Sequence, residues 1–172
     1  MLLGLFVLTV LAGSAGAAEA PPGVGDPAPP LEIVTPAGDA PASPLAGEVV
    51  VVDFFATWCK PCHSALRDLV AIREQLGPRV RFVLVDVDEE PDAVREFLQH
   101  NPLPGGAQVT IDPGAVVMRR WGARTFPTTF LVDGAGVVRH INRGWGAGYR
   151  ARLLTWLRPM LAAAAAAPAR AR

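Results

Sequence analysis

Cys59 and Cys62 are the two cysteines of the chain, and the two residues between them give a Cys-x-x-Cys spacing. Such a pair closes a small ring with little chain to order, so it can cycle between dithiol and disulfide through a mixed disulfide with a substrate. A bridge between near neighbours constrains almost no loop, which argues against a structural disulfide framework. Half of a zinc site is the other interpretation, but zinc needs two further ligands, and His63, His100 and His140 lack a suitable spacing. The pattern therefore favours redox chemistry.

The cysteine pair lies where two predicted elements meet. Residues 49–55 form a run of β-branched and aromatic residues, which is typical of a strand buried on both faces. From Cys59 onward the apolar residues follow a helical period, and they are Cys62, Ala65, Leu66, Leu69 and Val70. We therefore predict that the cysteines lie at the N-terminus of a helix.

A helix N-terminus favours a thiolate over a thiol, because its first turn has unpaired N–H groups and the positive end of the helix dipole. Cys59 is therefore the predicted nucleophile. Lys60 adds a positive charge beside it, and Pro61 suits the first helical turn, where no donor is lost. Cys62, one turn further along on the apolar face, is the predicted resolving thiol.

Three stretches resemble parts of one family. Residues 52–62, Val-Asp-Phe-Phe-Ala-Thr-Trp-Cys-Lys-Pro-Cys, resemble the active-site segment of the thioredoxin superfamily, including an acid six positions before the first cysteine. Residues 124–133, Arg-Thr-Phe-Pro-Thr-Thr-Phe-Leu-Val-Asp, are similar to the segment that bears the family's cis-proline. Residues 25–31, together with Gly38 and residues 45–47, resemble the N-terminal hairpin of the exported TlpA/ResA-like branch. The resemblance covers about residues 24–158.

The resemblance also implies a substrate-binding surface. It implies a cis peptide between Phe126 and Pro127 that faces Cys59, with the Phe126 backbone as a short edge on which an extended substrate pairs. Without the resemblance, Pro127 is simply the start of an edge strand. Trp58 either covers the cysteine pair as part of this surface or packs in the core.

Asp53 lies in the middle of the apolar strand, where a charged and unpaired carboxylate is unfavourable. Burial should therefore raise its pKa and keep it largely protonated. Such a group can take up the proton of Cys62 when that thiol attacks a mixed disulfide. The alternative is that Asp53 is a buried acid of the core with no catalytic role. Thioredoxins pair this acid with a lysine, and Leu84 takes that place here. The ResA-like branch carries a glutamate where this chain has Ala65.

The remaining patterns predict an α/β chain with a thioredoxin-like fold, in which helices flank a central mixed β-sheet. An N-terminal hairpin and a helix and strand inserted between the core halves extend the minimal fold, at 31–34 with 42–45, 91–100 and 109–111. The other predicted elements are a strand at 79–85, a helix from Asp112 to Arg120, a hairpin at 128–132 and 136–141, and a closing helix that Pro159 ends.

Both ends of the chain differ in composition from the middle. Residues 1–18 are an apolar block followed by small residues, which is the pattern of a signal peptide, although no Lys or Arg precedes the block. We expect a cleaved signal or a retained N-terminal anchor, and a buried helix is the alternative. A proline-rich linker at 19–30 leads into a domain at 31–158, and a low-complexity tail follows at 159–172.

The acidic and basic residues number 16 each, so the formal net charge is zero and nothing indicates a nucleic-acid partner. We expect a periplasmic or otherwise exported, monomeric thiol-disulfide oxidoreductase that needs no cofactor or metal. Pro61 resembles the reducing members of the family, which favours reduction of protein disulfides. The resemblance implies a protein disulfide or thiol substrate, such as apocytochrome c, and a membrane thiol carrier as electron donor. The alternatives are an oxidant that introduces disulfides, a non-catalytic binding module and a cytosolic general reductase.

Overall fold

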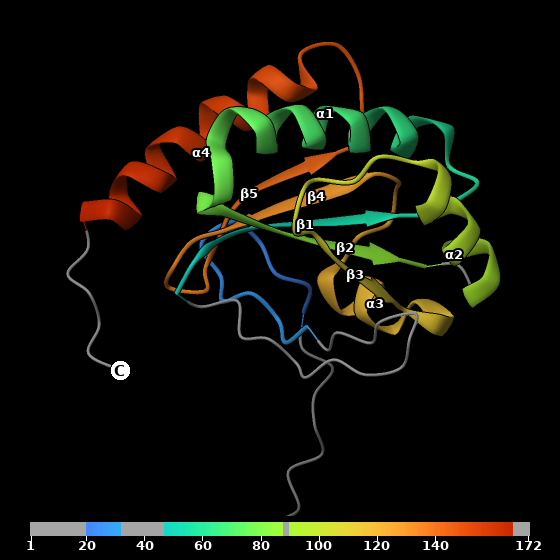
Figure 1. Cartoon of the computed structure of the whole chain (residues 1–172). Coiled ribbons are helices and arrows are strands. Elements are labelled where there is room, and N and C mark those ends of the chain that lie inside the picture. The colour runs from blue at the N-terminus through green and yellow to red at the C-terminus, as the bar shows by residue number, and fades with distance from the viewer. Residues whose placement is uncertain (1–19, 32–46, 88–89, 167–172) are drawn as a thin grey trace, which may run out of the picture.

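Strand β1 (Val49–Phe55) lies at the centre of a five-stranded mixed sheet with the order β3-β2-β1-β4-β5 (Figure 1). The structure is a computed structural model that describes residues 20–31, 47–87 and 90–166. The other strands are β2 (Val80–Asp86), β3 (Gln108–Ile111), β4 (Thr128–Val132) and β5 (Val138–Arg143). The helices are α1 (Lys60–Leu76), α2 (Pro91–His100), α3 (Val116–Trp121) and α4 (Tyr149–Ala166), with short 3-10 turns η1 (Gly77–Arg79) and η2 (Pro113–Ala115).

The strand directions confirm the thioredoxin-like fold class. Strands β1 and β2 are parallel and are connected through α1, and β3 extends the sheet in the same direction. Strand β4 pairs antiparallel with the other edge of β1, and β5 pairs antiparallel with β4. The inserted helix and strand are α2 and β3. The predicted N-terminal hairpin lies outside the described residues, except for the buried Leu31.

The sheet separates two apolar cores. Helices α1 and α4 cover one face, and α3 covers the other (Figure 1). Alternate residues of β1 point to opposite sides, so Val51 and Phe55 pack with α1 and α4, whereas Val52 and Phe54 pack with residues such as Trp121. This two-sided burial explains why β1 is continuously apolar. Asp53 shares the parity of Val51 and Phe55, which places it on the α1 and α4 side.

Helix α4 corrects one prediction, because it does not end at Pro159 but continues to Ala166. The ring of Pro159 is on the exposed side of the helix, whereas Leu161, two residues later, is 6% exposed and belongs to the same core cluster as Leu157. Burial of Leu161 and the high helix propensity of the alanines that follow offset the hydrogen bond lost at the proline. Residues 167–172 of the predicted tail lie outside the described residues.

The described part of the predicted linker packs along β5. Gly25 donates a backbone hydrogen bond to Val138 O at 2.8 Å, and Val138 N donates to Asp26 O at 2.9 Å. Pro21 lies against Gly122, which has a φ of +67°, and a Cβ added at Gly122 would come within 2.5 Å of the Pro21 Cβ. These contacts fasten the segment to the domain. The signal segment at 1–18 lies outside the described residues, and no helix among those described is long and apolar enough to cross a bilayer.

Candidate active site

Cys59 and Cys62 form a disulfide at the start of α1, with a Cα–Cα distance of 5.3 Å. Cys59 is the N-cap residue, and its Sγ accepts a hydrogen bond from the backbone N–H of Cys62 at 3.2 Å. The two cysteines differ in accessibility, since Cys59 is 5% exposed and Cys62 is fully buried. A substrate can therefore reach Cys59 before Cys62.

The first turn of α1 provides a positive environment for the Cys59 sulfur. No acidic residue lies in that turn, and Lys60 extends from it as an exposed cation. Pro61 occupies the start of the helix, where its missing N–H leaves no intrahelical bond unmade. The N–H of Cys62 and the helix dipole both favour negative charge on Cys59 when the disulfide is reduced.

The Phe126–Pro127 peptide bond is cis, as the resemblance implied. The ring of Phe126 makes an edge-on contact with the ring of Trp58, with 5.8 Å between the ring centroids, so this segment lies beside the residue that precedes Cys59. Trp58 is 68% exposed, which shows that it does not pack in the core. The carbonyl of Pro127 accepts a hydrogen bond from Gly144 N at 2.7 Å, which fixes the segment to the loop after β5.

Asp53 is fully buried, and burial raises its pKa from 3.8 to about 7. The hydroxyl of Thr129 donates to Asp53 Oδ1 at 2.6 Å, which opposes part of that rise. The Tyr149 hydroxyl lies 2.8 Å from the same Thr129 oxygen. Asp53 Oδ2 has no hydrogen-bond partner among the residues that the structure describes. The carboxyl group is thus held at one oxygen and unpaired at the other.

The two positions where the family resemblance implies a charged partner for this acid are both apolar here. Leu84 on β2 is the direct register partner of Asp53, and Ala65 on α1 is buried in the same core. The polar partners come instead from β4 and α4, through Thr129 and Tyr149, neither of which was predicted from the sequence. One signal was available, because Tyr149 is the single tyrosine and lies on the apolar face of its helix, where a buried phenol needs a hydrogen-bond partner.

The three histidines lie on three different elements. His63 Nε2 is 2.7 Å from the carbonyl oxygen of Thr57, and its ring centroid is 5.1 Å from that of Phe97. His100 is exposed at the end of α2, and His140 on β5 stacks on Trp156 of α4. Within the described ranges, no group of three or more His, Cys, Asp or Glu side chains is arranged to hold a metal ion.

A family model described as "AhpC/TSA family" matches residues 24–141. Among curated proteins, thiol-disulfide oxidoreductase ResA of Bacillus thuringiensis subsp. konkukian is 33% identical over 95 residues, which cover 54% of this chain and 53% of ResA. Thiol:disulfide interchange protein HelX of Rhodobacter capsulatus is 31% identical over 90 residues, covering 52% of this chain and 49% of HelX. The chain therefore matches only about half the length of these relatives.

Two solved structures from Chlorobium tepidum have a similar fold. A candidate thiol:disulfide interchange protein DsbE has a TM-score of 0.74 and 26% identity, covering 81% of this chain and 98% of its own. A thiol:disulfide interchange protein of the thioredoxin family has a TM-score of 0.63 and 27% identity, covering 81% of this chain and 99% of its own. The likeness thus extends over most of the described domain.

Proposed function

The chain belongs to the AhpC/TSA family and to the ResA-like branch of the thioredoxin superfamily, and we propose that it is a thiol-disulfide oxidoreductase that works through Cys59 and Cys62. The observation that carries the proposal is the asymmetric cysteine pair. Its first sulfur caps a helix and belongs to a residue that is 5% exposed, and its second belongs to a fully buried residue one turn later. This arrangement suits a nucleophile followed by an intramolecular resolving thiol.

The proposed reaction reduces a substrate disulfide in two exchanges. The Cys59 thiolate attacks one substrate sulfur, the substrate S–S bond breaks, and the other substrate sulfur leaves as a thiolate. Cys62 then loses its proton, and its sulfur attacks Cys59 Sγ in the mixed disulfide. The second substrate thiolate leaves as the Cys59–Cys62 bond forms. The dithiol gives up two electrons, and the substrate disulfide gains them.

Asp53 is the proposed acceptor of the Cys62 proton. It lies on the side of β1 that α1 covers, in the same layer as the buried Cys62. A carboxyl group with a pKa of about 7 can both accept and release a proton near neutral pH. The neutral surroundings at Leu84 and Ala65 leave burial as the main cause of that pKa.

We place the substrate on the surface formed by Trp58, Phe126 and Pro127. The exposed indole of Trp58 and the partly buried ring of Phe126 provide apolar area beside Cys59. An extended polypeptide that carries a disulfide suits this surface, because the rings of Trp58 and Phe126 can make apolar contacts with it next to the reacting sulfur.

We further propose that the protein acts outside the cytoplasm as a reductant of protein disulfides. The apolar residues 1–18, Pro61 between the cysteines and the similarity to ResA and HelX support this proposal. A membrane thiol carrier would then supply electrons, and apocytochrome c is one candidate substrate. Equilibration with glutathione tests the direction, because an oxidant would have a less negative potential. N-terminal sequencing of the mature protein tests cleavage of residues 1–18.

The direct test is to trap the mixed disulfide in cells. Cys62→Ser leaves the nucleophile without its resolving thiol, so it should accumulate covalent adducts that are released by a reductant. Cys59→Ser is the matched control and should capture nothing, because Cys62 is buried. A non-catalytic binding module would keep its activity in Cys59→Ser. Equal capture by both variants, or by neither, would overturn the proposal.

A further inference from the structure

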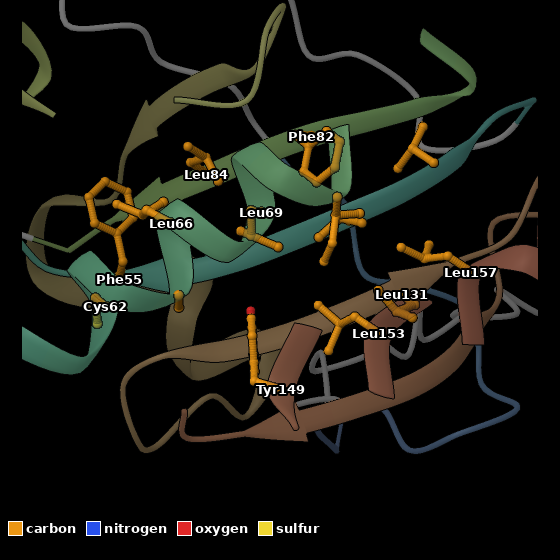
Figure 2. Packing of buried hydrophobic residues seen from close by; sticks show 14 of the residues in the cluster. Phe55, Cys62, Leu66, Leu69, Phe82, Leu84, Leu131, Tyr149, Leu153 and Leu157 are labelled. Atoms are coloured by element: carbon orange, nitrogen blue, oxygen red, sulfur yellow. The ribbon is translucent and has the colours of Figure 1, made fainter. Parts of the chain in front are cut away.

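We propose that Tyr149 and Thr129 are positioning residues that make Oδ2 of Asp53 the oxygen that exchanges the proton in the resolving step. The inference rests on the proposed thiol-disulfide exchange. It concerns a chain of three polar groups from three elements, α4, β4 and β1, that crosses an otherwise apolar core. Figure 2 shows the Tyr149 oxygen pointing from α4 toward the sheet, among the labelled apolar side chains.

The number of hydroxyl hydrogens gives this series of hydrogen bonds a direction. The Thr129 hydroxyl has a single hydrogen, and it donates that hydrogen to Asp53 Oδ1 at 2.6 Å. At its contact of 2.8 Å with Tyr149, the Thr129 oxygen must therefore accept, and the Tyr149 hydroxyl must donate. Both hydroxyl hydrogens thus point toward the carboxyl group.

This direction distinguishes the two carboxyl oxygens. Oδ1 is an acceptor from Thr129, so a proton on Oδ1 that is donated to Thr129 would require both hydroxyls to reverse. Oδ2 is buried and has no partner among the described residues, so a proton there costs no existing hydrogen bond. When Cys62 gives up its proton, Oδ2 of Asp53 takes it, and Oδ2 later releases it to solvent as the acid ionises again.

Tyr149 is suited to this role because it remains a donor. Its side chain is 1% exposed, and burial raises its pKa well above 10, with the negative charge of Asp53 as the next cause. Asp68 of α1 and Arg152 of α4 also act on the phenol, in opposite directions. Among the described residues of the other elements around Asp53, Leu84 of β2 is its register partner, Thr129 of β4 donates to it, and Cys62 of α1 is buried in the core cluster on the same side of the sheet.

The test is the pKa of Asp53, measured by carbon NMR titration of the oxidised protein, in which the cysteines do not titrate. Thr129→Val removes the donor to the carboxylate and should raise the pKa by about 1 to 2 units. Tyr149→Phe frees Thr129 to accept from a protonated Asp53 and should raise the pKa by about 0.5 to 1 unit. Thr129→Ser keeps the hydroxyl and should restore the wild-type value.

A second measurement separates positioning from packing. In the reduced protein, the pH at which resolution of a mixed disulfide reaches half of its maximal rate should move with the Asp53 pKa in each variant. An Asp53 pKa that is unchanged in both Thr129→Val and Tyr149→Phe would overturn the inference. A rise of the Asp53 pKa in Thr129→Ser equal to that in Thr129→Val would also overturn it. If the pKa pattern appears but the wild-type protein exchanges no disulfides, the proposed function fails and the hydroxyl chain stands.

Discussion

Replacing Asp53 with asparagine should make the protein less sensitive to alkaline pH. The folded state holds the Asp53 proton up to pH 7 or so, whereas the unfolded chain releases it near the ordinary value of 3.8. Between these values the folded state binds the extra proton, so the free energy of unfolding falls as pH rises. The stabilising contribution is complete below about pH 4 and is lost above about pH 7. The amide in Asp53→Asn does not titrate, so a plot of unfolding free energy against pH for that variant lacks this fall.

The size of the effect follows from the pKa. A rise from 3.8 to about 7 is roughly three units. At about 1.4 kcal/mol per unit, it corresponds to about 4 kcal/mol of stability lost across the window. Other groups with shifted pKa values, such as Asp133, are common to both proteins, so they cancel in the difference between the two curves. The cost of burying the amide in Asp53→Asn is independent of pH and shifts one curve without changing its slope.

The assay is urea unfolding of the oxidised wild-type protein and Asp53→Asn at a series of pH values from 4 to 9. The difference in unfolding free energy should change by about 4 kcal/mol in favour of the variant over this range, with most of the change between pH 4 and 7. Parallel curves would mean that Asp53 ionises normally in the folded state. The proton route through Asp53 would then have no basis.

Two further substitutions test the structure around the site. The carboxylate of Asp112 accepts hydrogen bonds from Val117 N at 2.9 Å and Met118 N at 2.8 Å, at the start of α3. Asp112→Ala should therefore lower the free energy of unfolding, measured by urea denaturation, by about 0.5 to 2 kcal/mol. An unchanged denaturation midpoint would contradict this capping role. The indole of Trp58 is exposed and contacts Phe126, so it is available to bind a substrate. Trp58→Ala should therefore raise the KM for a protein disulfide several-fold and leave the alkylation rate of the Cys59 thiol unchanged. Loss of thiol reactivity with an unchanged KM would count against a docking role.

Local sequence patterns predicted most of the fold because each element carries its own signal. The apolar run of β1, the helical period of α1 and the turn before β5 depend on neighbouring residues. The end of α4 could not be predicted in this way. Whether a helix continues past Pro159 depends on the burial of Leu161 against residues distant in the chain, and a proline by itself indicates only an interruption.

The candidate site was predictable to the extent that its residues are close in sequence or resemble a family segment. The cysteine pair and the cis peptide before Pro127 were found for these reasons. The hydrogen-bond partner of Asp53 was not, because Thr129 is 76 positions away and meets it only through the pairing of β1 with β4. Strand register between distant segments is set by the whole sheet.

The most direct measurement is the rate of iodoacetamide alkylation of the reduced protein as a function of pH, with the two cysteines resolved by mass spectrometry. The helix N-terminus, the N–H of Cys62 and the charge of Lys60 should make Cys59 react first, with a thiol pKa below that of a free cysteine. If Cys59 and Cys62 titrate together near the free value and react equally, the account of this site is contradicted.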